Sequence, residues 1–132
     1  MQPQILRLLA SSILLGSAIA LQSLPLPVET VSHIGLGVWI DNIAARANGQ
    51  ILAVGLTPNL FQVDPLGDAT AAIVATFPSP ITAIAGLTET SHDVFYVTAG
   101  NVTNTTIVAT TGTLSVWEVN MNGYKIGRAS CR

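Results

Sequence analysis

The chain has 132 residues, of which 9% are charged, and its formal net charge is −2 at pH 7. That length suits one modest domain. Between Leu21 and Tyr124 the only base is Arg46, against seven carboxylates. A surface that neutralises phosphates needs clustered Lys or Arg, so we expect no nucleic-acid partner.

Residues 1–20 have the organisation of a secretory signal peptide. Arg7 gives the positive n-region, residues 8–15 give the apolar h-region, and Ala18-Ile19-Ala20 gives the small-x-small cleavage pattern. The apolar run is shorter than the roughly 20 residues of a membrane-spanning helix. The alternative interpretation of residues 1–20 is an uncleaved signal anchor. We therefore predict a secreted chain that leaves the membrane once the leader is removed.

Two adjacent N-x-[ST] acceptors begin at Asn101 and Asn104. In an exported chain such acceptors carry N-linked glycan and indicate a surface loop. We expect a glycoprotein modified at Asn101 or Asn104, because two acceptors only three residues apart disfavour modification of both at once.

Tyr124-Lys125-Ile126 would be the return strand of a hairpin, but residues 127–132 become abruptly basic and small. We therefore expect residues 125–132 to be an atypical, disordered tail on a chain cut short. Cys131 is the only cysteine, and a secreted chain with one cysteine has no internal disulfide framework. It is interpreted either as an intermolecular bridge or reactive thiol, or as an incidental residue of the tail.

Short apolar runs separated by turn residues follow the leader. They are rich in Val, Ile, Thr and aromatic residues and have the length of β-strands. No stretch shows a capped apolar stripe of 3.6-residue period, so the predicted fold class is all-β. The predicted strands are Ile51–Leu56, Leu60–Val63, Ala71–Phe77, Ile81–Leu87, Val94–Ala99, Thr106–Thr111 and Leu114–Val119.

Turn residues separate these runs. Asn48-Gly49 predicts a hairpin with a type I′ turn, because both residues accept positive φ. Asp64-Pro65-Leu66-Gly67 predicts a type I turn, and Asn122-Gly123 predicts a second hairpin. Phe77-Pro78-Ser79-Pro80 forbids a helix and predicts a loop.

The strand pattern repeats along the chain. Ile51–Leu56 recurs 43 positions later as Val94–Ala99, and Leu60–Asp64 recurs 56 positions later as Val116–Asn120. The second copy thus contains 13 extra residues, which include both sequons. A unit of about 40 to 45 residues with four short strands is typical of a propeller blade. An immunoglobulin-like sandwich is the alternative, but it does not explain the repeat.

Residues 39–52, WIDNIAARANGQIL, resemble the W-[IL]-E-N-[IL]-A-V-R-x-N-G-x-[IL]-L opening of a group of fungal secreted six-bladed β-propellers. Leu60–Pro65, Asp93–Asn101 and Ser115–Val119 resemble that group's following strands. The group belongs with the senescence-marker-protein/gluconolactonase-like propellers and includes hetero-Diels–Alderases that act on tropolone sesquiterpenoids. The resemblance covers roughly residues 28–124.

The resemblance implies that residues 21–124 are two to three N-terminal blades of a partial six-bladed propeller. It implies a pericyclase of fungal secondary metabolism that orients a small apolar metabolite without a cofactor. The alternative enzyme is a gluconolactonase-like lactone hydrolase, which would require a divalent cation. A third interpretation is an inactive or binding remnant.

Asp41, Asn42 and Arg46 are the candidate catalytic residues, because they are polar groups in an apolar strand that the resemblance places near the central channel. Asp41 stands where the family has a Glu that is one methylene longer. The alternative is structural, with Arg46 paired to Asp41 and Asn42 bonded to backbone. Asp41 and Asn42 alone cannot supply the several oxygen ligands of a hard cation.

Ser91-His92-Asp93 contains the three residue types of a catalytic triad in consecutive positions. Neighbours on a strand point to opposite faces, so we interpret this tripeptide as a polar turn. His33 is the only other histidine, which makes a weak case for a metal site. Trp39 and Trp117 are expected to pack within the sheets.

Overall fold

The computed structural model describes residues 29–35, 37–67, 70–103 and 105–129. The all-β prediction is confirmed, since these residues form strands and no helix. No helix within these ranges could cross a membrane. The predicted signal peptide and Cys131 lie outside the described residues. The strands are β1 (Ile40–Ala45), β2 (Ile51–Gly55), β3 (Asn59–Val63), β4 (Ala72–Thr76), β5 (Ala83–Ser91), β6 (Val94–Gly100), β7 (Val102–Thr103), β8 (Val108–Ala109), β9 (Ser115–Asn120) and β10 (Lys125–Arg128).

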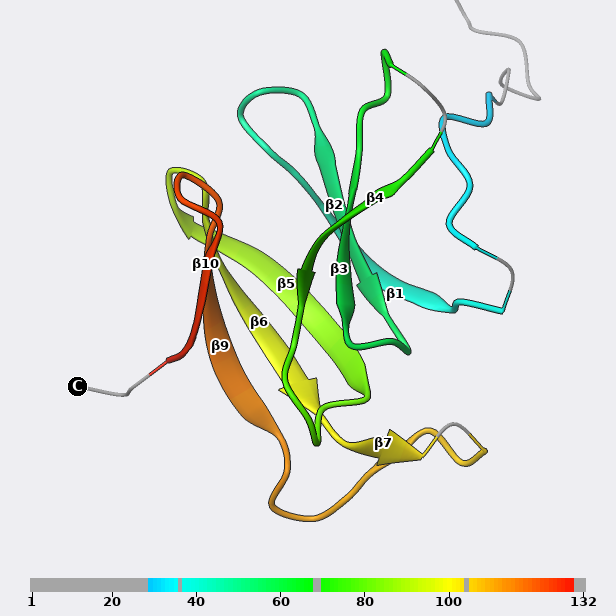
Figure 1. The fold of residues 1–132 in the computed structure, drawn as a ribbon, viewed down its shortest axis with the longest axis vertical. Helices are drawn as coiled ribbons and strands as arrows, with labels where there is room; N and C mark the ends of the chain where they lie inside the picture. The colour runs from blue at the N-terminus through cyan, green and yellow to red at the C-terminus, as the bar shows by residue number, and fades with distance from the viewer. Residues whose placement is uncertain (1–28, 36, 68–69, 104, 130–132) are drawn as a thin grey trace, which may run out of the picture.

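Two four-stranded antiparallel sheets make up most of the fold. The first has the order β1-β2-β3-β4 and the second the order β5-β6-β9-β10, so both follow the chain. The short hairpin β7–β8 is inserted between β6 and β9 and projects from the second sheet (Figure 1). It occupies the region of the 13 extra residues, where the sequence predicted a single strand over 106–111.

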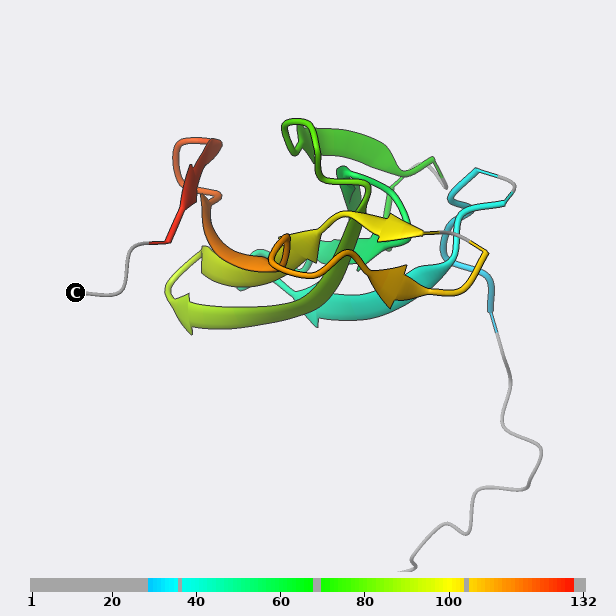
Figure 2. The same cartoon turned by 90° about the horizontal axis from the view of Figure 1, so that it is seen from below.

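The hydrophobic core lies between the two sheets. The first sheet contributes Leu52, Val54 and Leu60, each 0% exposed. The second contributes Phe95 and other buried side chains of β5, β6 and β9 to the same cluster. Strand β5 also contacts β1, β2 and β3, and in Figures 1 and 2 β1 and β5 run in the same direction.

The strand pairing corrects the register of the predicted repeat. Ile51 pairs with Val63, and Phe95 pairs with Val119. Offsets of 43 and 56 residues therefore cannot both hold. An offset of 44 for β2 to β6 keeps the offset of 56 for β3 to β9, matching Ile51 to Phe95 and Val63 to Val119. The same offset matches β1 to β5, because Ile43 pairs with Ala53 and Leu87 pairs with Val97.

This one-residue change reverses which faces correspond, because alternate residues of a strand point to opposite faces. The buried face of the second sheet contains Phe95, Val97, Val119 and Trp117. The matching residues of the first sheet, such as Ile51 and Ala53, do not lie on the face that contributes Leu52 and Val54 to the core. They lie on the opposite face of that sheet. The two sheets therefore pack face to back.

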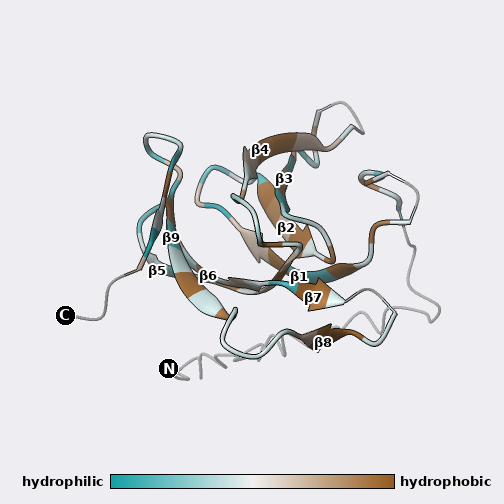
Figure 3. Cartoon of the chain, turned by 60° about the horizontal axis from the view of Figure 1, so that its bottom comes forward, coloured by the Kyte–Doolittle hydropathy of each residue, from teal (hydrophilic) through white to brown (hydrophobic). Residues whose placement is uncertain are grey.

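That opposite face of the first sheet is apolar. Direct cross-strand pairing places Ile43, Ala53, Phe61 and Ile73 in one row across all four strands. Ile43 and Ile73, at the two ends of this row, are 63% and 57% exposed, whereas Ala53 and Phe61 in its middle are buried. Ile51 and Val63 form the next row. Figure 3 shows hydrophobic residues along β2, β3 and β4. We call these six residues the outer apolar face.

Hairpin turns occur at the predicted positions, with one difference in type. Gly49 has φ of 86°, whereas Asn48 is not in the positive-φ region. The amide of Gly49 donates to the carbonyl of Arg46 at 2.9 Å, and Arg46 N donates to Gln50 O at 2.8 Å. The loop thus has three residues with a left-handed glycine at its end, rather than a two-residue type I′ turn.

The end of the described chain is more ordered than the composition predicts. Lys125–Arg128 pair with β9 as strand β10, in the register Lys125 with Asn120 and Arg128 with Trp117. Residues 125–128 thus belong to the second sheet and do not begin a disordered tail. Residues 130–132 lie outside the described ranges.

Gly55 generates a stability prediction. A Cβ at this position would lie 1.8 Å from the carbonyl oxygen of Trp39, which accepts the amide of Leu56. We expect Gly55→Ala to lower the free energy of unfolding by about 2–3 kcal/mol, because backbone must move to admit the methyl group. The matched control is Gly127→Ala, where nothing lies within 4 Å of the added atom. Urea denaturation measures both, and equal values would contradict the close approach.

Candidate functional site

The most highly connected polar group of the described chain is the guanidinium of Arg46. It follows β1 directly, and the residue is 8% exposed. Its Nε donates to Asp93 Oδ1 at 2.9 Å and its Nη2 to Asp93 Oδ2 at 2.5 Å. Its Nη1 donates to Oε1 of Gln62 at 2.6 Å and to Oε1 of Gln50 at 3.0 Å. The fork of Arg46 therefore binds Asp93 bidentately and is also bonded to its own sheet.

Asp93, the acceptor of this bidentate bond, belongs to the second sheet. It lies in the turn between β5 and β6 with φ of 59°, a conformation that Asp adopts more readily than most residues. Its backbone amide donates to Glu89 Oε1 at 2.9 Å, and its carbonyl accepts the amide of Met121 at 2.8 Å. The turn between β9 and β10 is thereby attached to the same point. We call Arg46, Gln50, Gln62 and Asp93 the inter-sheet clamp.

The clamp favours the charged form of both of its ions. The hydrogen bonds from Arg46 hold the pKa of Asp93 below its ordinary value, against the opposing effect of burial. The hydrogen bonds to Asp93 raise the pKa of Arg46. The two side chains are 6% and 14% exposed, so water screens their attraction only weakly.

The three predicted catalytic residues do not form one cluster. Asp41 is exposed and Asn42 is half-buried, with a β-bulge between Ile40 and Asn42. Arg46 pairs with Asp93 and not with Asp41. Its four hydrogen bonds use four of its five N–H groups, which assigns Arg46 to holding the sheets together.

The interpretation of Ser91-His92-Asp93 as a turn is confirmed. Strand β5 ends at Ser91, β6 begins at Val94, and the carboxylate of Asp93 is bound by Arg46. His33 is in an isolated bridge to Thr70. Across the described ranges, no group of three or more His, Cys, Asp or Glu is placed to hold a metal ion.

A cleft of about 340 Å³ opens beside Trp117. One wall is the connection from β4 to β5. The rest is formed by Asn101, the loop before β9, the first residues of β9 and the last residue of β10. Trp117 contacts Phe77 edge to face, with ring centres 5.5 Å apart and planes at 75°. Its indole Nε1 donates to Ser115 Oγ at 2.8 Å. The lining residues are Pro78, Ser79, Pro80, Ile81, Asn101, Gly112, Thr113, Ser115, Trp117 and Arg128.

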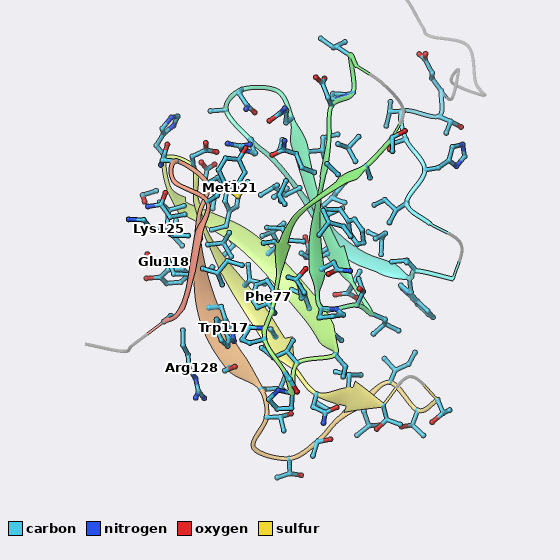
Figure 4. All side chains as sticks on the ribbon, viewed as in Figure 1. Phe77, Trp117, Glu118, Met121, Lys125 and Arg128 are labelled. Atoms are coloured by element: carbon cyan, nitrogen blue, oxygen red, sulfur yellow. The ribbon has the colours of Figure 1, made fainter. Side chains whose placement is uncertain are left out.

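Arg128 gives the cleft its charge. It pairs with Trp117 across β9 and β10 and is exposed (Figure 4). Its guanidinium has no hydrogen-bond or ion-pair partner among the residues that the structure describes. None of the residues that line the cleft is acidic. The cleft therefore combines one unpaired cation with an aromatic side chain and a proline-rich wall.

The sequence patterns do not indicate this cleft, because they predict that Trp117 packs within a sheet and that Arg128 lies in a tail. One signal was present, since Asn122-Gly123 predicted a hairpin after the strand containing Trp117. Extending that hairpin to residue 128 brings Arg128 opposite Trp117. The predicted glycosylation site Asn101 also lines the cleft, whereas Asn104 lies outside the described residues.

Comparisons of the chain with protein-family models, with curated proteins and with solved structures give no significant match. The resemblance of residues 39–52 to fungal propellers therefore stays a prediction.

The clamp predicts a large effect of removing its cation. We expect Arg46→Met to lower the free energy of unfolding by about 3 kcal/mol, because the carboxylate of Asp93, only 14% exposed, is left uncompensated. The control Arg128→Met removes an exposed cation without a partner and should change stability by less than about 0.5 kcal/mol. Chemical denaturation at pH 7 distinguishes these outcomes, and equal losses would contradict the assigned role of Arg46.

The clamp also predicts a dependence of stability on pH. The folded-state pKa of Asp93 is lowered, so its contribution is present above the unfolded value near 3.8 and is lost as pH falls through the folded value. We expect the stability difference between the wild type and Asp93→Asn to shrink from pH 6 to pH 2.5. Denaturant titrations at several pH values measure it. A difference that stays constant over this range would show that Asp93 is not bound as a carboxylate.

Proposed function

We propose that the two sheets are neighbouring blades of a β-propeller, and that the protein is a pericyclase-type enzyme of fungal secondary metabolism. The observation that carries the architecture is the face-to-back packing of two sheets with the same strand order. Blades arranged radially around a channel pack in this way, because each is related to the next by a rotation.

The outer apolar face supports a propeller over a two-layer sandwich. In a sandwich the outward residues of each strand are polar, because they meet water. Here the outward rows of the first sheet consist of Ile, Ala, Phe and Val, and Ile43 and Ile73 at their ends are exposed. A sheet that is apolar on both faces needs a layer on each. We propose that another blade covers the outer apolar face.

The position of the first strands supports a channel. Strands β1 and β5 run side by side in the same direction, as the innermost strands of adjacent blades do. Asp41 and Asn42 lie on β1 and contribute polar groups at that position. Asn42 is proposed to donate a hydrogen bond to the carbonyl of an apolar substrate, while the channel holds diene and dienophile at reacting distance. Such a mechanism requires no nucleophile.

The lactone hydrolase has less support from the described residues. It requires several convergent oxygen ligands for a divalent cation. Asp41 and Asn42 are not joined by a third such ligand in the part of the chain that the structure describes. A non-catalytic binding role is compatible with the fold, but it does not call for polar groups on β1.

The test is a cycloaddition between an enone heterodiene and an electron-rich alkene, with the product analysed by chiral chromatography. We expect a rate above background and an enantiomeric excess that EDTA does not change. Asn42→Ala should lower both, whereas Asp64→Asn, in the turn after β3, should lower neither. A racemic product at the background rate would contradict the proposal. Lactone opening that EDTA abolishes would favour the hydrolase.

A further inference from the structure

We infer that the cleft beside Trp117 binds a small carboxylate with an apolar body, the carboxylate on Arg128 and the body against Trp117 and the wall of Pro78, Pro80 and Ile81. This inference is independent of the proposed reaction, because the cleft lies away from Asp41 and Asn42 and uses none of the clamp residues.

The charge of the cleft selects an anion. The whole chain has a net charge of −2, yet no acidic residue lines this cleft and Arg128 is at its rim. The guanidinium of Arg46 is bound by a carboxylate of the chain, whereas that of Arg128 has no partner within the described ranges. A guanidinium fork matches a carboxylate bidentately, and such charge-assisted pairs are stronger than neutral hydrogen bonds.

The walls select an apolar body. The cleft is lined by two prolines, Ile81 and the indole of Trp117. The indole also packs edge to face against Phe77. Trp117 is also fixed by its bond to Ser115, so the aromatic surface is ordered before a ligand arrives. The volume of about 340 Å³ lies at the small end of the range for small-molecule sites. A body the size of a phenylpropyl group suits these dimensions.

The remaining polar groups add a second point of recognition. The hydroxyl of Ser79 has no hydrogen-bond partner in the described part of the chain, and it lies in the wall. Asn101, which also lines the cleft, uses its Oδ1 to accept from Thr82 at 3.4 Å, and its Nδ2 has no hydrogen-bond partner in the described part of the chain. A glycan on Asn101 would consume that donor and occupy the same space. The cleft is therefore tested in protein without this glycan, made with Thr103→Ala.

The experiment compares 3-phenylpropanoate with its neutral analogue 3-phenylpropanol. The chain has two tryptophans, and Trp39→Phe leaves the indole N–H resonance of Trp117 as the single reporter in a proton–nitrogen correlation spectrum. We expect 3-phenylpropanoate to shift this resonance saturably and to bind at least tenfold more tightly than the alcohol. Saturation at equal affinity for both compounds, or no shift with either, would overturn the inference.

Variants locate the anion. Arg128→Gln should weaken binding of 3-phenylpropanoate roughly tenfold or more, because it removes the charged partner. Arg128→Lys should keep part of the affinity, since it retains the charge without the bidentate fork. Lys125→Gln is the matched control on the same strand outside the cleft, and should leave affinity within about twofold. Loss of affinity in Lys125→Gln equal to that in Arg128→Gln would show a diffuse charge effect and overturn the site.

Discussion

The bidentate bond between Arg46 and Asp93 is the interaction on which the arrangement of the two sheets depends. It joins the loop after β1 to the turn between β5 and β6, across 47 positions of the chain. Gln62 and Gln50 complete the coordination of the guanidinium from the first sheet. Met121 attaches the β9–β10 turn through the carbonyl of Asp93. One charged group thus connects three loops at the same end of the structure.

The apolar core alone would not determine this arrangement. Hydrophobic burial is non-directional, and two amphipathic sheets can slide against each other at small cost. A bidentate ion pair that is largely buried tolerates little displacement before its hydrogen bonds fail. We infer that the core provides most of the stability and that the clamp specifies how the sheets are aligned.

The face-to-back packing links the fold to the proposed function. A two-sheet sandwich would close its core and present polar outer faces, whereas here the first sheet leaves the row from Ile43 to Ile73 apolar. The second sheet's outer face mixes Tyr96 and Val116 with Thr88 and Glu118. The proposed further blade against the first sheet would explain this difference. In the proposed propeller, β1 would line the channel and the cleft of Arg128 would be a separate site.

Local patterns in the sequence predicted the strands well. Short apolar runs rich in Val, Ile, Thr and aromatic residues located β2, β3, β4, β6 and β9 to within two residues at each end, and Asn48-Gly49 located the first hairpin. The turn type was wrong because Asn48 does not enter the positive-φ region. The repeat offset was wrong by one residue because matching apolar letters cannot distinguish the two faces of strands such as Ile51–Gly55 and Val94–Gly100, which are apolar at consecutive positions.

Contacts between distant segments were beyond local patterns. The sequence contains only one base between residues 21 and 124, which made Arg46 conspicuous, but nothing local indicates which of seven carboxylates it binds. Asp93 was set aside as part of a polar turn, and that turn is what presents its carboxylate to Arg46. The cleft was missed for the same reason, since it is formed by a loop at residues 78–81 and a hairpin some forty residues later.

Native-state hydrogen exchange tests the central claim, that the core and the clamp make one cooperative unit of the two sheets. The amides of β2 and β3 report on the first sheet and those of β6 and β9 on the second. We expect the most protected amides of both sheets to exchange with the same free energy, which equals the free energy of global unfolding. A first sheet that opens at a distinctly lower free energy, while the second stays protected, would contradict it.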